Sequence, residues 1–334
     1  MRRSSLLEFL GPLVALGLIV LVVAVTTPTF LSAQNFNNVA LQAAVLAVVA
    51  LGSTAVILTG GIDLTPGSMI ALLTMCLAVM MKLNGYPIWV SILGVLGLGA
   101  LFGAVNGFLV AFVRIPAFIV TLAGLSAYKG FALTIGPGAP IFSLPGGFEN
   151  IFYGSLLGIP LPLYYVLALY ALGTVVLNHT RFGRELYAVG GNEAAAVLTG
   201  IKVRRVRLMA FLIAGLCAGI AAVLLAARLN SGSPNYGDLI ELQAIAAAVV
   251  GGASLAGGRG HVINTLVGVL IIVVVQNGLN LNAVSTSLQS ISIGLIILLA
   301  VGVDIWRGSL VRTVITRKSR LARRNNTLPE GSTA

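Results

Sequence analysis

Residues 39–67 read VALQAAVLAVVALGSTAVILT and then GGIDLTPG, an apolar run that leads into a glycine-rich segment. The first part, residues 39–59, carries no charged side chain. About 20 consecutive apolar residues form a helix long enough to cross the hydrocarbon core of a bilayer. The stretch therefore predicts a membrane-spanning helix that stops at a pair of glycines.

The composition extends this prediction to the whole chain. Hydrophobic residues make up 58% of the 334 positions, charged residues make up 9%, and the mean hydropathy is +1.03. A soluble domain carries about 25% charged residues. Too few polar groups remain to cover a water-facing surface, so lipid must be the solvent. The predicted fold class is all-α, a polytopic transmembrane helical bundle.

The apolar runs predict about ten spans in two related halves. They cover residues 9–25, 39–59, 68–81, 88–112, 115–135, 161–177, 208–227, 239–255, 262–276 and 288–303. The third and ninth runs are short. No A-x-A-like cleavage site follows the first, which is therefore read as a retained span. Residues 1–306 form the predicted transmembrane domain, and residues 307–334 a basic cytoplasmic tail.

The basic residues predict the orientation. With the N-terminus inside, 17 of the 20 lysines and arginines lie on the inner side. Lys82 and Arg228 fall at outer ends, and Lys129 lies within the fifth span. Cytoplasmic loops carry an excess of positive charge. We expect a multi-pass protein of the inner (plasma) membrane with both termini in the cytoplasm.

The charge distribution and the rare residue types exclude several function classes. The net charge of +11 gathers in short flanks of the spans, so it does not indicate a nucleic-acid surface. The two cysteines and two histidines lack the spacing of metal ligands, and no catalytic cluster can be assembled. We expect no metal, no cofactor and no enzymatic site. A phosphate-binding loop is also missing from the sequence. If ATP drives the activity of this protein, another chain must hydrolyse it.

Two glycine segments share the pattern GGxxLxxG, at residues 60–67 and 251–258. Each closes a span that enters from outside, and each precedes one of the short spans. Paired glycine-interrupted segments of this kind indicate a transport pathway; a tight inner hairpin between two helices explains them equally well. The candidate pathway residues are Gly60, Gly61, Asp63, Asn106, Gly251, Gly252, Ser254 and Asn277. For the two asparagines, helix packing is an equally plausible role.

Two ionisable residues stand out near the spans. Asp63 is expected to cap the helix that begins near Pro66, with a direct contact to solute as the less favoured alternative. Lys129 either snorkels outward or faces a central cavity, and snorkelling is favoured.

The longest inner loop predicts a short capped helix. Asn192 is a good N-cap, Glu193 suits the positive end of a helix, and Gly200 is placed to end it. About two turns are too few to be stable alone in water, so the helix needs a packing surface. The small side chains of Ala194, Ala195 and Ala196 would let another backbone come close. The helix either docks on a cytosolic partner or packs on its own bundle.

These segments together resemble a known family. GGIDL at residues 60–64, RFGR at 181–184 with GGN at 190–192, and GGASL at 251–255 are similar to the permeases of ribose-type ABC importers. That family belongs with the branched-chain amino acid and monosaccharide permeases. The resemblance covers residues 9–306. It implies a permease subunit that moves a monosaccharide, paired with a second permease copy or a homologous permease, with a cytosolic ABC ATPase and with a periplasmic or extracellular sugar-binding protein.

The resemblance also implies a role for the inner-loop helix. Asn192, Glu193, Ala194, Ala195, Ala196 and Gly200 are similar to the segment that couples the ATPase to the permease, with alanine where the fuller pattern has glutamate. The alternative function is an ion-coupled secondary transporter of a small polar solute. That class usually places paired ionisable residues inside its spans, and here only Lys129 and, marginally, Asp63 qualify.

The predicted orientation is tested by reporter fusions in two loops. A reporter inserted within residues 136–160 should be active only on the outside, and one within residues 178–207 only in the cytoplasm, because 17 of the 20 basic residues then lie inside. The measurement is the activity of a side-specific enzyme fused at each site. Two loops that report the same side would contradict the topology.

Overall fold

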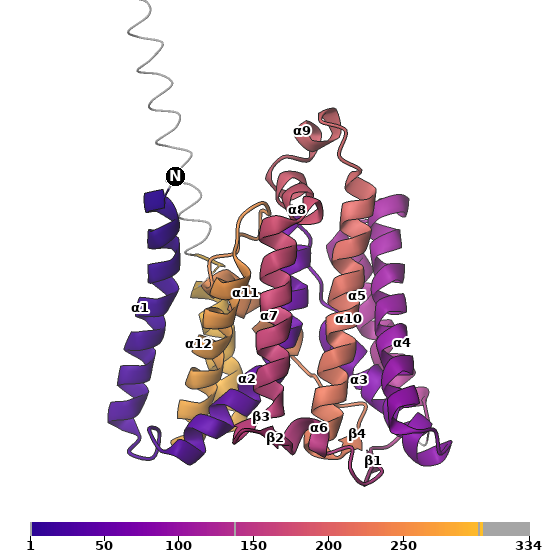
Figure 1. The fold of residues 1–334 in the computed structure, drawn as a ribbon, viewed down its shortest axis with the longest axis vertical. Helices are drawn as coiled ribbons and strands as arrows, with labels where there is room; N and C mark the ends of the chain where they lie inside the picture. The colour runs from indigo at the N-terminus through magenta and orange to yellow at the C-terminus, as the bar shows by residue number, and fades with distance from the viewer. Residues whose placement is uncertain (1, 137, 300, 303–334) are drawn as a thin grey trace, which may run out of the picture.

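A computed structural model describes residues 2–136, 138–299 and 301–302 of the chain. The predicted basic tail at residues 307–334 lies outside the described residues. Figure 1 shows the described part as a bundle of roughly upright helices. Two short antiparallel strand pairs lie at one end: β1 (Ile141–Phe142) with β4 (Ser231–Gly232), and β2 (Ser155–Leu156) with β3 (Ile159–Pro160).

The helices follow the predicted spans closely. Their bounds are α1 Arg2–Thr26, α2 Ala33–Leu58, α3 Pro66–Ala78, α4 Ile88–Phe108, α5 Ala117–Thr134, α6 Asn150–Tyr153, α7 Leu161–His179, α8 Arg181–Gly191, α9 Glu193–Leu198, α10 Val203–Leu229, α11 Ile240–Val250 and α12 Val262–Leu281. Two π-helical segments, η1 Val79–Leu83 and η2 Leu109–Val113, extend α3 and α4. A further apolar helix covers Thr286–Leu299.

Seven helices in the described part are long and apolar enough to cross a membrane, and three shorter apolar helices accompany them. The helical membrane bundle is therefore confirmed. Two predicted lengths were wrong. The ninth span is the full helix α12 with 20 residues, whereas α11 before it has only 11. α11 is short because Leu239 before it adopts a left-handed conformation and Gly251 ends it.

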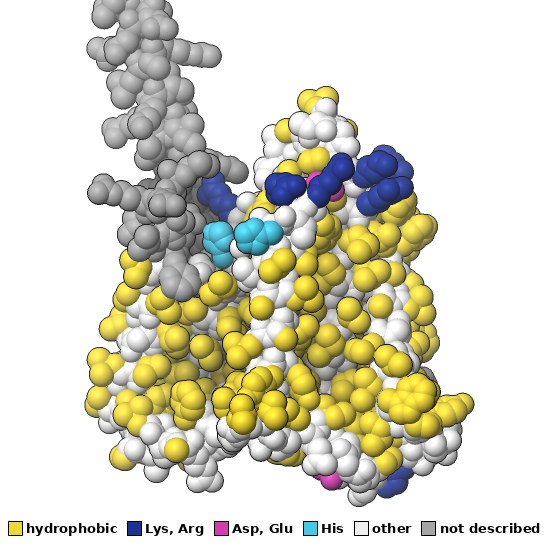
Figure 2. Space-filling model, in the orientation of Figure 1, with side chains coloured by type: hydrophobic (Ala, Val, Ile, Leu, Met, Phe, Trp, Pro, Cys, Tyr) yellow, Lys and Arg dark blue, Asp and Glu magenta, His cyan; other side chains and the backbone are white. Residues whose placement is uncertain are grey.

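The two ends of the bundle differ in charge. Figure 2 shows lysine and arginine gathered at the end that carries α8 and α9, with a hydrophobic band below it. We name this the basic end, and the end with β1–β4 the strand end. A band of apolar side chains between two polar rims is the pattern of a protein embedded in a bilayer.

The centre of the bundle is α2, the helix of the opening apolar run. Its residues from Ala43 to Leu58 are all buried, because the helix is apolar on every side and other helices surround it. A second close contact joins α4 to α10. A Cβ added at Gly103 of α4 would lie 3.0 Å from the Cα of Gly215 of α10, so only glycine permits this approach.

Candidate functional site

Two helices begin inside the bundle and meet there. α2 ends at the basic end, residues 59–65 are not helical, and α3 then begins at Pro66. α11 begins after an irregular segment that rises from β4 at the strand end (Figure 1). The first turns touch: a Cβ at Gly67 would overlap the Glu241 carboxylate and the Gly237 carbonyl oxygen. Glycine is required at position 67 for this contact.

Asp63 lies just before this junction and is only 4% exposed. Its Oδ1 accepts hydrogen bonds from the Thr65 backbone N–H at 2.9 Å and from the Thr65 hydroxyl at 2.6 Å. The predicted capping role was therefore wrong in detail. Thr65 is the N-cap of α3 and makes no side-chain cap bond, while Asp63 closes a turn in front of it. Pro66 at the first helical position has no N–H to offer a cap.

A chain of polar side chains leads from Asp63 across three elements. Asn106 of α4 donates to the Thr65 hydroxyl oxygen at 3.3 Å, and Tyr128 of α5 donates to Asn106 Oδ1 at 2.9 Å. All four residues are buried. Buried polar groups in a membrane protein must find partners within the protein, and this chain provides them while it ties α4 and α5 to the start of α3.

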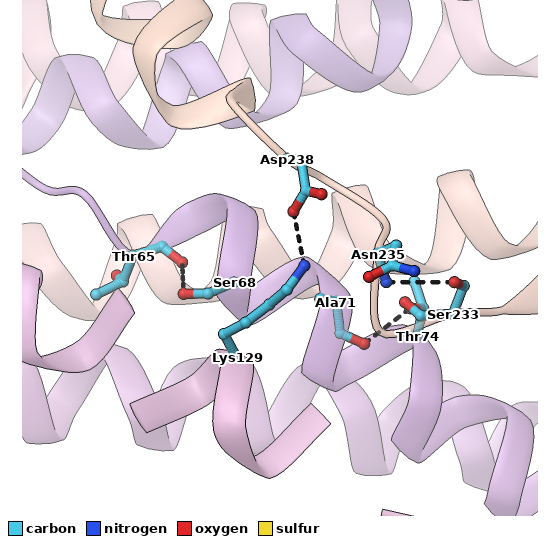
Figure 3. A network of polar contacts seen from close by, with 8 residues as sticks. All are labelled: Thr65, Ser68, Ala71, Thr74, Lys129, Ser233, Asn235 and Asp238. Carbon is cyan, nitrogen blue, oxygen red and sulfur yellow. Dashed lines mark hydrogen bonds and ion pairs between the residues drawn. The ribbon is translucent and has the colours of Figure 1, made fainter. Parts of the chain in front are cut away.

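Lys129 does not snorkel outward, so that prediction was wrong. Its Nζ lies 2.8 Å from Asp238 Oδ1, in the irregular segment before α11 (Figure 3). Sequence reasoning missed Asp238 altogether. One signal was available, because Asp238 and Glu241 are carboxylates directly in front of a short apolar run, the same position that drew attention to Asp63.

The two GGxxLxxG segments come together at the basic end. Gly258 N donates to the Leu58 carbonyl oxygen at 3.0 Å, and a Cβ at Gly257 would lie 2.8 Å from Gly60 N. Gly60 and Gly257 have φ of 78° and 86°, a region that favours glycine. Both segments are therefore tight turns that pack against each other, with Gly251 as the C-cap of α11 and Gly252 beyond it.

The C-terminal turn of α8 closes this glycine junction. A Cβ at Gly190 would overlap the Leu58 carbonyl oxygen and reach 2.5 Å from Gly258 N. Tyr187, one turn earlier, donates to the Gly260 carbonyl oxygen at 2.8 Å. Burial raises the pKa of the Tyr187 hydroxyl above its usual range. α8 is thus packed against, and hydrogen-bonded to, the turns that follow α2 and α11.

The predicted capped helix exists as α9. Asn192 Oδ1 accepts from Ala195 N at 3.1 Å, and Gly200 has φ +79°. Gly200 N donates a hydrogen bond to the Val197 carbonyl oxygen, and Ile201 N donates one to the Ala196 carbonyl oxygen. These two hydrogen bonds are the pattern of a Schellman C-cap. The predicted N-cap at Asn192 and the predicted helix end at Gly200 are therefore confirmed.

The side chains of α9 divide between two faces. Ala196 is 3% exposed and packs on the protein itself, whereas Ala194 and Ala195 are exposed and Leu198 is 88% exposed. Glu193 is held by Arg207 of α10 through two hydrogen bonds, at 2.6 Å and 3.1 Å. The inner face of α9 is therefore bound to its own bundle, and the outer face is uncovered.

A cavity of about 830 Å³ lies beside α9 at the basic end. Gly60 and Gly61 line it together with Glu193, so one candidate pathway segment and the α9 helix face the same space. Its cationic lining residues are Arg114, Lys202, Arg204, Arg205 and Arg207. Asn277, by contrast, lies elsewhere. Its amide exchanges two 2.9 Å hydrogen bonds with Asn35 and joins α12 to α2.

Residues 35–301 match the family model described as "Branched-chain amino acid transport system / permease component". The chain belongs to this family of permeases. It is accordingly a transport component rather than an enzyme, and a multi-pass membrane protein.

Named relatives resemble this permease over almost their whole length. The ribose import permease RbsC of Bacillus subtilis (strain 168) is 42% identical over 303 residues, which cover 90% of this chain and 94% of the relative. RbsC of Escherichia coli (strain K12) is 40% identical, over 87% and 92% of the two chains. The D-allose permease AlsC of the same strain is 34% identical, over 88% and 90%. No solved structure matches the chain.

The glycine junction is tested by two neighbouring substitutions. Gly190→Ala should lower the thermal unfolding midpoint of the detergent-solubilised permease by about 5 °C, because the new methyl group would overlap the Leu58 carbonyl oxygen. Gly191→Ala is the matched control, since a Cβ there meets no atom within 4 Å among the described residues. Equal midpoints for the two variants would show that α8 does not pack as described.

Proposed function

We propose that this permease is the transmembrane subunit of an ATP-driven ABC importer that carries a monosaccharide across the inner membrane. The observation that carries the proposal is the similarity to ribose import permeases at 39–42% identity over about nine tenths of the chain. Relatives named for D-allose and xylose, at 34% identity, broaden the substrate class to monosaccharides. The sequence has no phosphate-binding loop, so a separate subunit supplies ATP hydrolysis.

The proposed topology has ten spans in two related halves, with both termini in the cytoplasm. Ten apolar helices in the described part, seven long and three short, support this count. The positive-inside rule supports a cytoplasmic basic end. Support for related halves comes from α3 and α11, because each follows an irregular segment and begins inside the bundle beside a carboxylate, Asp63 or Glu241.

The proposed partners are an ABC ATPase at the basic end, a sugar-binding protein at the strand end, a second permease copy or homologous permease, and membrane lipid. The coupling segment is Asn192 to Gly200, which includes Glu193, Ala194, Ala195 and Ala196. Its uncovered face supports this role. Leu198 is 88% and Val197 57% exposed at the basic end. Exposed apolar side chains at such a position favour a protein contact.

The proposed pathway includes Gly60, Gly61 and Asp63, with Asn106 behind them. The cavity at the basic end supports the first two, since both glycines line it next to α9. Gly251, Gly252 and Ser254 belong to the turn that packs on Gly60, and we keep them in the proposed pathway for that reason. Asn277 remains a weaker proposal, because its side-chain amide is hydrogen-bonded to that of Asn35.

A second candidate function is an ion-coupled secondary transporter. The Lys129–Asp238 pair favours it, because such transporters place paired ionisable residues within their spans. The two functions differ in their source of energy, so a reconstitution separates them.

The importer function is tested in proteoliposomes with the permease, its ATPase and its binding protein. Uptake of radiolabelled D-ribose should require all three proteins and ATP, and should survive a protonophore and a sodium ionophore. Uptake by the permease alone that collapses with the ion gradient would instead establish the secondary transporter.

The coupling role is tested by Ala195→Arg. An arginine on the uncovered face of α9 should leave the protein folded in the membrane, but lower the rate of ATP-driven ribose uptake at least about tenfold, because a bulky charge would be buried unpaired at the contact. A disulfide crosslink from Glu193→Cys to the ATPase measures the contact directly. The control is Ala195→Ser, which keeps a small uncharged side chain at the same exposed position and should leave uptake unchanged. Normal uptake and normal ATPase association in Ala195→Arg would refute the coupling role.

A further inference from the structure

The Lys129–Asp238 ion pair lies at a depth where the surrounding bundle is apolar. Lys129 stands twelve residues beyond the start of α5, which is about 18 Å from the basic end at 1.5 Å per residue. Asp238 lies two residues before Ile240, the first residue of α11, whose 11 residues span about 16 Å to the same end. The two estimates agree. Lys129 is five residues, about 8 Å, from the other end of α5, so the pair lies within the length of the spanning helices, nearer the strand end.

The pair is also open to its surroundings. The Asp238 side chain is 64% exposed and that of Lys129 is 29% exposed. The neighbouring carboxylates are covered, since Asp63 is 4% and Glu241 is 7% exposed. Charged groups at this depth almost always face the bundle interior or a water-filled cavity, because contact with lipid tails is costly. A water-filled space beside the exposed side of the pair would remove this cost.

The ion pair is not what holds its segment in place. Thr74 of α3 donates to the Ser233 carbonyl oxygen at 3.3 Å, and Asn235 N donates to Ser233 Oγ at 3.2 Å (Figure 3). Gly237 packs directly on Gly67. These contacts position the segment without any charge. The fold alone therefore does not explain why the protein accepts the free-energy cost of an exposed ion pair within the membrane.

We propose that Lys129 and Asp238 line a water-filled passage nearer the strand end and that they contact the solute as it passes, with Asp238 accepting hydrogen bonds from hydroxyl groups. The identity of the solute as a neutral polyhydroxylated molecule rests on the proposed function. Asp238 uses Oδ1 for Lys129, and a carboxylate has acceptor positions to spare. The Lys129 ammonium has further N–H groups for hydroxyl oxygens.

The surrounding charge selects against anionic solutes. Glu241 lies within electrostatic range of Asp238, Asp63 and Lys129, but Glu241 and Asp63 are covered, so Asp238 is the carboxylate of this group that a solute would meet. Asp238 would repel a sugar phosphate, whereas it can accept hydrogen bonds from the hydroxyl groups of a neutral sugar. The chemistry of the site therefore fits an uncharged polyol.

The passage is tested first by thiol accessibility, which needs no knowledge of the solute. Ser126 is exposed and lies one turn before Lys129 on the same side of α5. In a permease with Cys76→Ala and Cys217→Ala, Ser126→Cys should react with a charged, water-soluble methanethiosulfonate at least about tenfold faster than Leu172→Cys, which is 60% exposed at the middle of α7. Equal, slow labelling of the two would overturn the inference, whatever the permease transports.

The solute contact is tested by ATP-driven uptake of radiolabelled D-ribose in the complete reconstituted complex. Asp238→Asn should lower the maximal uptake rate about tenfold with an unchanged thermal midpoint, and Asp238→Glu should recover part of it. The exchanged pair Lys129→Asp with Asp238→Lys keeps the ion pair but moves the carboxylate, and it should not recover uptake. Leu172→Ala, a change at a 60% exposed position in the middle of α7, should leave uptake unchanged.

The outcomes separate the two claims. Full recovery of uptake by the exchanged pair would show a purely structural ion pair and overturn the solute contact. A wild-type complex that imports no ribose would refute the proposed function instead, and the thiol labelling would still decide whether the passage exists.

Discussion

The structure depends on a constraint that lipid imposes on the backbone. No water is present in the hydrocarbon core to bond with peptide groups, so irregular segments are tolerated there only when protein or a water-filled space surrounds them. Residues 59–65 and the segment before α11 are both irregular within the bundle. The contact of Gly67 with Gly237 and Glu241 brings them together, and the Asp63–Thr65–Asn106–Tyr128 chain supplies polar partners on one side. The helices around them are arranged to enclose this junction.

The same segments connect the two ends of the permease. The turn after α2 leads from the glycine junction at the basic end directly into residues 59–65 and α3. α8 is fastened to that turn at Leu58, and α9 follows α8 after Asn192 alone. A displacement of α9 by a partner would therefore be transmitted through close backbone contacts, which have little room to absorb it. This short route explains why so many of the contacts there require glycine.

Much of the candidate site was open to prediction because its signals are local. Asn192, Glu193 and Gly200 act within one short helix, so cap chemistry identified them without any tertiary contact. The pathway residues were harder. Gly60 and Gly257 are far apart in the chain, and only the packed bundle shows that their turns touch. Asp238 was missed for the same reason, since its importance comes from a lysine 109 residues away.

The sequence by itself determined that lipid surrounds the protein, that the fold is all-α, and roughly where each helix lies. These follow from composition and from apolar runs of membrane length. It also carried the family motifs. Tertiary structure alone decided that Lys129 is paired rather than snorkelling and that both glycine segments meet α8. Those outcomes depend on which distant surfaces come into contact, and no local propensity or periodicity contains that information.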